Sequence, residues 1–267
     1  MPGGSGGSIF GAVLGHTLVV VSDAHLGATP PLVEATLLSF LETVPDLGDA
    51  LLINGDLFDF WYSYRRVVPR RGFHVAAALA RLARRVPVVM IGGNHDRWGG
   101  DFWHREVGAT FHPHRATFAI GARRIAAIHG DGLTEPGLRA MLLHRLINHP
   151  LTAVMYRLLH PELGLRLVDA LSPHLGDHTP DPAKLAAAAE RQASWAADLL
   201  RREPELNLVI MGHTHHAATA ALSPAQQYLN PGAWLDGYRY AVVTEQAIEL
   251  RRFSPAEPPP PGSGAPR

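Results

Sequence analysis

The first half of the chain alternates short apolar runs with segments in which apolar residues recur at helical spacing. Apolar, β-rich runs span residues 17–22, 50–54 and 87–91, and each ends in a glycine or polar cluster, as a buried strand does. Between them, residues 31–43 and 73–85 carry apolar residues three or four positions apart, which predicts two helices. Strands that are apolar throughout and alternate with helices are typical of a buried, largely parallel sheet.

A β-hairpin pattern opens the second half of the chain. We expect strands at residues 116–120 and 124–128, joined by a turn at Gly121-Ala122. Further strands are expected at 206–211 and through 240–253, with turn residues between the runs. These strands would complete the sheet structure that the first half begins.

A helical region separates the hairpin from the last strands. Residues 134–204 show helical spacing almost throughout, and we expect them to form an inserted lid within one domain that spans residues 17–254. Because proline cannot continue a helix, breaks are expected at Pro150, Pro161, Pro173 and residues 180–182.

The two ends of the chain are expected to be flexible. Residues 1–16 lack the basic leading segment and the small-residue cleavage pattern of a secretory signal. Residues 255–267 are rich in proline, glycine and serine, which predicts a disordered tail. No uninterrupted apolar stretch reaches the ~18 residues of a membrane-spanning helix. We therefore expect a cytoplasmic protein and leave open a peripheral contact at the inner membrane face.

Composition narrows the partners and the kind of metal site. Lys plus Arg and Asp plus Glu both number 24, so nothing indicates the basic surface of a duplex-binding protein, and we expect no specific nucleic-acid partner. The chain has no cysteine. A metal site must therefore use imidazole, carboxylate and amide groups, a set that suits Mn, Fe, Mg or Zn.

Five polar clusters stand where predicted strands stop, and each contains residues that can bind a metal ion. They are Asp23-Ala24-His25, Gly55-Asp56, Gly93-Asn94-His95-Asp96, His129-Gly130-Asp131 and Gly212-His213-Thr214-His215. Each cluster alone is weak evidence, because such short combinations also occur as ordinary turns and helix caps. Ordinary turns do not explain why all five strand ends finish in ligand residues. The pattern therefore predicts a metal site at one edge of the sheet.

In order and spacing, the clusters resemble the motif blocks of the calcineurin-like metallophosphoesterase superfamily: D-x-H, G-D, G-N-H-D, H and G-H-x-H. The resemblance covers about the whole folded chain and implies an α/β four-layer sandwich, with two mixed β-sheets flanked by helices. It also implies two divalent ions, with Mn²⁺ the expected metal. The first ion would be held by Asp23, His25, Asp56 and His215, and the second by Asp56, Asn94, His129 and His213.

Two such ions explain why these residue types are needed. Cations held roughly 3.5–4 Å apart clamp phosphoryl oxygens, lower the pKa of a bound water and stabilise charge in an in-line displacement. The resemblance makes His95 a catalytic residue that stabilises the phosphate or leaving oxygen and acts as general acid, without binding metal. It makes Asp59 the carboxylate that orients His95, and the structural alternative is an Asp that caps the next helix.

The run Gly-Asp-Leu-Phe-Asp-Phe-Trp at residues 55–61 is similar, more narrowly, to the UDP-2,3-diacylglucosamine hydrolases of lipid A biosynthesis. That similarity implies a lipid-linked nucleotide as the phosphate-containing substrate and cleavage of its diphosphate. One position departs from it, because those enzymes typically carry Arg where this chain has His95. The alternative is a general phosphomonoesterase or phosphodiesterase with a soluble substrate. An inactive protein-binding scaffold is disfavoured, since no expected ligand is missing.

The helical region has two interpretations of its own. Residues 138–171 are dense in large aliphatic residues but punctuated by arginine and histidine. A helical pair with a solvated basic face would show this pattern, and so would an apolar lid that receives acyl chains and directs arginines towards phosphate. The lid interpretation makes five residues candidates for substrate binding: Arg157, Arg145, Leu142, Leu146 and Met155. The basic loop of Arg65, Arg66, Arg70 and Arg71 has two interpretations, contact with the same diphosphate and solvated charge, of which solvated charge is favoured.

Overall fold

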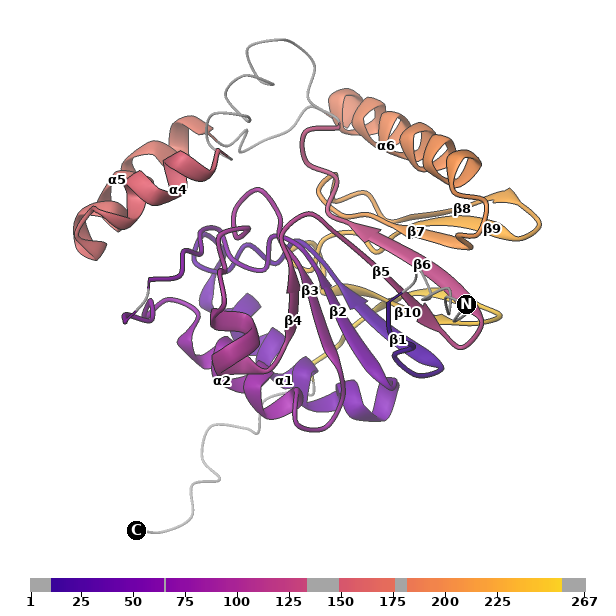
Figure 1. The fold of residues 1–267 in the computed structure, drawn as a ribbon, viewed down its shortest axis with the longest axis horizontal. Helices are drawn as coiled ribbons and strands as arrows, with labels where there is room; N and C mark the ends of the chain where they lie inside the picture. The colour runs from indigo at the N-terminus through magenta and orange to yellow at the C-terminus, as the bar shows by residue number, and fades with distance from the viewer. Residues whose placement is uncertain (1–10, 65, 134–148, 176–181, 256–267) are drawn as a thin grey trace, which may run out of the picture.

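Two β-sheets packed face to face, with helices on their outer sides, form the body of the protein (Figure 1). The computed structural model describes residues 11–64, 66–133, 149–175 and 182–255. The six strands of one sheet are, in spatial order, β11 (Ile248–Arg252), β10 (Arg239–Thr244), β1 (Thr17–Val21), β2 (Ala50–Asn54), β3 (Val88–Ile91) and β4 (Thr110–His112). The five of the other are β5 (Arg115–Ile120), β6 (Arg123–Ile128), β7 (Leu208–Ile210), β9 (Gln226–Asn230) and β8 (Ala218–Ser223).

Both sheets are mixed. Strands β1, β2, β3 and β4 run parallel, whereas β10 pairs antiparallel with β1. In the second sheet β6, β7 and β9 run parallel, and the predicted hairpin joins β5 to β6 through Gly121-Ala122. The predicted strands and hairpin are thus confirmed, and so is the four-layer sandwich.

Three apolar cores lie between the four layers, and the alternating side chains of the first sheet contribute to two of them. In β1, Leu18 and Val20 point between the sheets, where they pack with residues of the second sheet such as Ile210. Val19 and Val21 point the other way, into the core under helices α1 (Pro31–Leu47) and α2 (Phe73–Leu82). Because both faces are covered, the central strands are apolar throughout, as the sequence predicts.

Helix α6 (Pro182–Arg202) forms the fourth layer. Its residues Ala196, Leu199 and Leu200 are buried against Val209 of β7 and other residues of the second sheet. Figure 1 shows α6 along the outer side of β7 and β8, while helices α4 (Pro150–Arg157) and α5 (Pro161–Leu175) lie apart from both sheets. The residues expected to form one insertion therefore include a helix that covers a sheet.

The prolines of the helical region mark helix starts. Pro150, Pro161 and Pro182 are the first residues of α4, α5 and α6, where proline loses no helical hydrogen bond. The expected break at Pro173 is wrong, because α5 continues past it to Leu175. A π-helical turn, η1 (Trp103–Val107), precedes β4 and was not predicted. Within the described residues, no helix is both long and apolar enough to cross a bilayer.

Candidate metal centre

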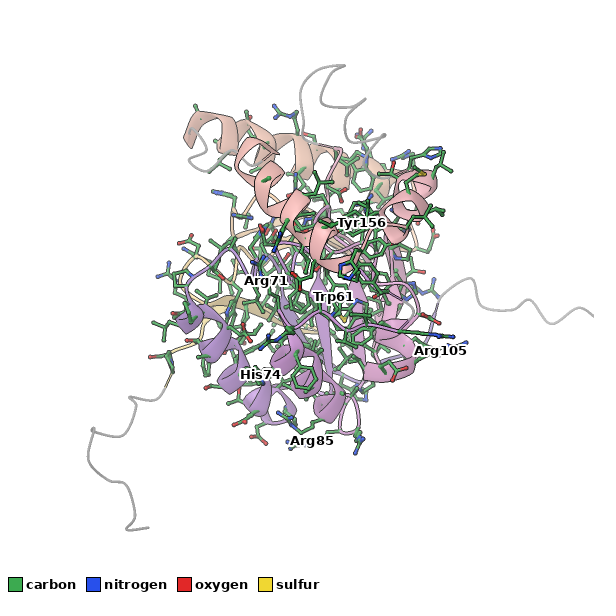
Figure 2. All side chains as sticks on the ribbon, turned by 90° about the vertical axis from the view of Figure 1, so that its left-hand side faces the viewer. Trp61, Arg71, His74, Arg85, Arg105 and Tyr156 are labelled. Carbon is green, nitrogen blue, oxygen red and sulfur yellow. The ribbon has the colours of Figure 1, made fainter. Side chains whose placement is uncertain are left out.

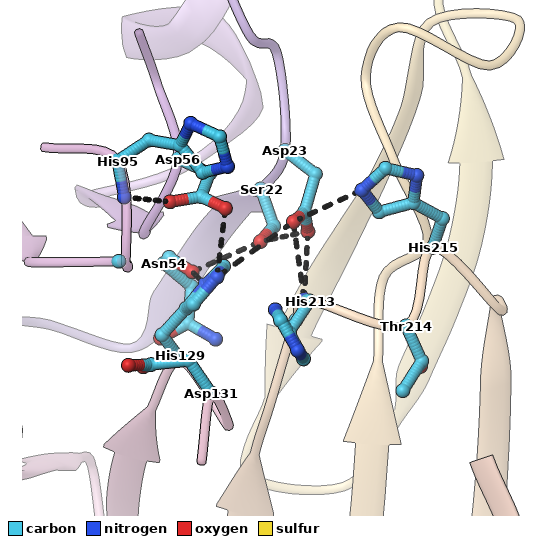
Figure 3. Close-up of polar contacts among 12 residues, drawn as sticks. Ser22, Asp23, Asn54, Asp56, His95, His129, Asp131, His213, Thr214 and His215 are labelled. Carbon is cyan, nitrogen blue, oxygen red and sulfur yellow. Dashed lines mark hydrogen bonds and ion pairs between the residues drawn. The ribbon is translucent and has the colours of Figure 1, made fainter. Parts of the chain in front are cut away.

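The five polar clusters lie together because the strands before them end at the same place. The parallel strands β1, β2 and β3 of one sheet, and β6 and β7 of the other, each lead directly into one cluster. Carboxyl ends of parallel strands meet at one edge, so segments almost 200 residues apart become neighbours there (Figure 3). The structure brings together the side chains of six predicted metal-ligand residues, Asp23, His25, Asp56, His129, His213 and His215, and the seventh, Asn94, lies in the loop whose residues Gly93 and His95 contact Asp56.

Potential ligand atoms fall into two main groups around Asp23 and Asp56. The side chains of Asp23, His25 and His215 each place one such atom within 4.8 Å of the others, and so do those of Asp56, His129 and His213. One oxygen of Asp56 lies 3.1 Å from Nε2 of His129 and 3.7 Å from Nε2 of His25. Asp56 therefore lies between the two groups, as a bridging ligand must.

Three buried polar atoms of the site have no hydrogen-bond partner. They are Nε2 of His25, Oδ1 of Asn94 and Nε2 of His129. A buried polar atom without a partner is costly and needs an explanation. A metal ion would satisfy all three lone pairs, so the donor set fits a divalent cation held by nitrogen and oxygen.

Backbone conformation sets these residues apart from the rest of the chain. Asp23, His25, Asp56, His213 and His215 all have positive φ, between 44° and 67°. Among the described residues, one further non-glycine residue, Tyr238, shares this left-handed conformation. Such a conformation costs of order 1–3 kcal/mol per residue and clusters at functional sites.

Hydrogen bonds fix the orientation of two histidine rings. Nδ1 of His129 is 2.8 Å from the carbonyl oxygen of Asn54, so Nδ1 carries the proton and Nε2 is left as a ligand atom. Nδ1 of His95 is 2.6 Å from the carbonyl oxygen of Asp59. The Asp59 carboxylate lies 3.7 Å from the same nitrogen, so the main-chain carbonyl of Asp59 makes the closer contact.

The neighbouring histidines keep the two buried carboxylates of the site, Asp23 and Asp56, negatively charged. Burial alone would raise the pKa of Asp56, but the charges of His129 and His95 hold that pKa well below its usual range. The pKa of Asp23 is likewise lowered, because His215 and His129 outweigh the effect of burial. Both carboxylates are therefore ionised, the form that binds a metal ion.

Asp96 is a functional residue to which the sequence analysis gave no role. Its buried carboxylate accepts hydrogen bonds from the backbone N–H groups of Leu57 at 2.7 Å, Gly93 at 2.9 Å and Asp56 at 3.3 Å. A side chain on Gly93 would lie 2.0 Å from Oδ1 of Asp56, so the two loops meet as closely as backbone allows. Asp96 therefore ties the Asn94 loop to the Asp56 loop, and its place at the end of the G-N-H-D block was the available signal.

A narrow cleft beside the metal centre is lined by Asp59, aromatic rings and α5. Phe60, Tyr62, Tyr64 and Arg71 line it from the core, and Leu165 and Val168 line it from α5. Tyr156 of α4 packs its ring against Phe60 and Tyr62, with centroids 5.5 and 4.7 Å away. Figure 2 labels Tyr156 among the side chains of this region, together with Trp61 and Arg71. These aromatic side chains were not predicted as part of the site, and Arg71 lines the cleft rather than being only solvated charge.

The predicted substrate residues are placed only in part. Leu142, Arg145 and Leu146 lie outside the described residues. Arg157 ends α4, but its side chain is also outside the described part of the chain. Met155 lies on α4 with 60% of its surface exposed, so it does not line a closed chamber in this structure.

Comparisons with known proteins show which families and structures this chain is similar to. Residues 16–217 match the family described as calcineurin-like phosphoesterase. A UDP-2,3-diacylglucosamine hydrolase of Porphyromonas gingivalis is 30% identical over 88% of this chain and 97% of its own. One of Enterobacter sp. is 27% identical over 87% and 97%. The solved structure of Yfce, a phosphoesterase from E. coli, has a TM-score of 0.43 at 15% identity and covers 87% of this chain and 90% of its own.

The family match covers most of the chain and contains the five clusters, with their residues gathered at one edge of the two sheets. This chain belongs to the calcineurin-like phosphoesterase family and is a metal-dependent hydrolase of phosphoric esters or anhydrides.

Proposed function

We propose that this protein hydrolyses the diphosphate of a lipid-linked nucleotide such as UDP-2,3-diacylglucosamine. The observation that carries the proposal is the length of the similarity, since relatives of that name match 87–88% of the chain, including the helical region. The aromatic and aliphatic lining of the cleft beside the metal centre supports it, because a purely polar substrate would not require such a lining.

Seven residues would hold two divalent ions, for which Mn²⁺ is the expected metal and Fe, Mg and Zn are alternatives. Asp23, His25, Asp56 and His215 would bind one ion, and Asp56, Asn94, His129 and His213 the other. When bound, the ions supply Lewis-acid stabilisation of the phosphoryl oxygens and an activated water.

His95 would act on the substrate directly. Its Nδ1 is engaged by the carbonyl of Asp59, which leaves Nε2 for a phosphoryl or leaving-group oxygen. The contact of His95 with Asp56 runs through its own main-chain N–H, 3.0 Å from the carboxylate. The imidazole is thus held beside the metal centre by groups that leave its second nitrogen unused.

The acyl chains of such a substrate would pack against α4 and α5. Met155 of α4 and Leu158, which caps the end of α4, expose 60% and 77% of their surfaces, and Leu163 of α5 exposes 58%. Each methylene buried there would contribute roughly 0.8 kcal/mol, so an acyl chain would discriminate strongly between substrates. The same exposed residues suit a peripheral contact with the cytoplasmic face of a membrane, where lipid-linked substrates reside.

The test is a comparison of kcat/KM for UDP-2,3-diacylglucosamine, UDP-N-acetylglucosamine and a small chromogenic phosphodiester, with and without chelator. We expect activity that chelation removes and Mn²⁺ restores, with a preference of at least 100-fold for the acylated nucleotide. Leu165→Gln, in the cleft wall on α5, should reduce that preference, whereas Leu250→Gln on the distant strand β11 should not. Equal rates on all three substrates would favour a general phosphoesterase with a soluble substrate.

A further inference from the structure

Gln192 is a fully buried polar residue in the middle of α6. It lies one helical turn from Ala196, on the helix face that packs against the second sheet. Burying an amide against apolar neighbours is costly unless its donors and acceptor are paired. A small apolar residue would serve for packing alone, so the hydrogen bonds of Gln192 indicate its role.

The amide of Gln192 binds both sides of His213. Its nitrogen donates to the carbonyl oxygen of Gly212 at 2.9 Å, and its oxygen accepts from the hydroxyl of Thr214 at 3.1 Å. Gly212 and Thr214 are the chain neighbours of His213 (Figure 3). Tyr228 and Asn230 of β9 donate to the same amide oxygen at 2.9 and 3.1 Å, which fixes the plane of the amide.

The same amide lies against the loop that carries His129. A Cβ at Gly130 would lie 2.3 Å from Nε2 of Gln192, so the amide occupies the space directly beside that glycine. Gly130 has a φ of 112°, which a side chain would strain in any case. One side chain from α6 therefore contacts the loops of both His129 and His213, whose ring centroids are 5.2 Å apart.

We propose that Gln192 is a positioning residue for the metal centre. Its amide fixes the position of the His129 loop relative to the His213 loop. Gln192 lies on α6, the helix that follows α4 and α5 in the chain. The inference rests on the proposed role of His129 and His213 as ligands of one ion. Groups that orient metal ligands typically change metal affinity 10–100-fold when they are removed.

Asn230 also supports the His213 loop, so the specific contribution of Gln192 is its contact with the His129 loop. The amide nitrogen of Asn230 lies 3.0 Å from both the Gly212 carbonyl and the Thr214 hydroxyl, so the His213 loop keeps one support when Gln192 is replaced. Gly130 is contacted by the Gln192 amide itself. Replacement should therefore loosen the two loops relative to each other without releasing the whole site.

The experiment titrates Mn²⁺ into the purified full chain by calorimetry, with no substrate present. Gln192→Met keeps the volume and removes the hydrogen bonds. We expect one of the two Mn²⁺ sites, the one that His129 and His213 would hold, to lose 10–100-fold in affinity while the other changes by less than threefold. Kinetics at saturating Mn²⁺ should then recover most of kcat, because the ligands themselves are intact.

Gln226→Met is the matched control. The Gln226 amide bonds the carbonyl oxygens of Leu200 and Leu206 at 3.1 Å and so ties β9 to the end of α6, away from both ligand loops. Its loss should lower the melting temperature without changing Mn²⁺ affinity. Thr214→Val, which removes one hydroxyl from the same network, should weaken Mn²⁺ binding in the same direction as Gln192→Met, and it decides the question if Gln192→Met does not fold.

Unchanged affinity in a folded Gln192→Met variant, or equal losses in Gln192→Met and Gln226→Met, would overturn the inference. If Gln192→Met does not fold, unchanged affinity in Thr214→Val overturns it as well. A wild-type chain that binds fewer than two Mn²⁺ ions would instead contradict the dinuclear centre of the proposed function, so the two failures are distinct.

Discussion

Replacement of His95 by Asn separates catalysis from metal binding at this centre. The imidazole lies near His25 and Asp56, and these three side chains also form a group whose ligand atoms lie within 4.8 Å of one another. Geometry alone thus permits His95 to be a ligand. We expect instead that His95→Asn retains both ions, because the bond of His95 to Asp56 is made by its main-chain N–H, which the variant keeps.

The expected loss in kcat is about 10²–10³, equivalent to about 2.7–4 kcal/mol, the range for removing one preorganised donor from a developing negative charge. Metal content by mass spectrometry and single-turnover rates on the best phosphodiester substrate give both quantities from the same sample. His16→Asn changes an exposed histidine just before β1, at the opposite end of that strand from the metal centre, and should match wild type in both. Loss of one ion from His95→Asn, or a kcat within fivefold of wild type, would refute the assignment.

Three further predictions concern the bridge, the core and pH. Asp56→Asn should abolish turnover and lower the metal content of both sites, measured by mass spectrometry, since its carboxylate lies between both ligand groups. Phe40→Ala should cost about 3–5 kcal/mol in chemical denaturation, because the ring is fully buried against Trp234, while activity per folded molecule stays unchanged. The hydrogen bond and charge of Arg115 lower the pKa of Glu203, so this pair stabilises the fold above the unfolded pKa of Glu203. The difference in thermal stability between wild type and Glu203→Gln should therefore be present at pH 7 and vanish as pH falls through the folded pKa.

The order of apolar runs and ligand residues along the chain was enough to predict that the metal ligands lie at one edge of the sheets. Strands β1 and β2 are continuous apolar runs, and parallel pairing requires their carboxyl ends to meet, so Asp23 and Asp56 had to become neighbours. The same reasoning extends to His129 and His213 in the second sheet. Convergence of the clusters therefore followed from the order of apolar runs and ligand residues along the chain.

Residues that support the site could not be found in this way. The partners of Asp96 on the Asp56 loop lie 38–40 residues away, and those of Gln192 lie 20–38 residues away, so no local spacing reveals either role. Strand β8 carries mostly small residues that are exposed or half-buried at the edge of its sheet, and it gave no apolar signal. Pro173 lacks a backbone donor, yet α5 continues two residues beyond it to Leu175, so the rule that proline ends a helix placed the break too early.

The left-handed backbone at five of the ligand residues lowers the stability of the fold when no metal is bound. Replacing His215, for example, by glycine would remove a ligand and relieve backbone strain of order 1–3 kcal/mol, partly offset by the loss of the ion pair between His215 and Asp23. In a lineage that no longer used the metals, substitutions of these ligand residues that relieve the strain would therefore be favoured. The five left-handed ligand residues therefore lower the stability of the cation-free fold, and metal binding would offset that loss.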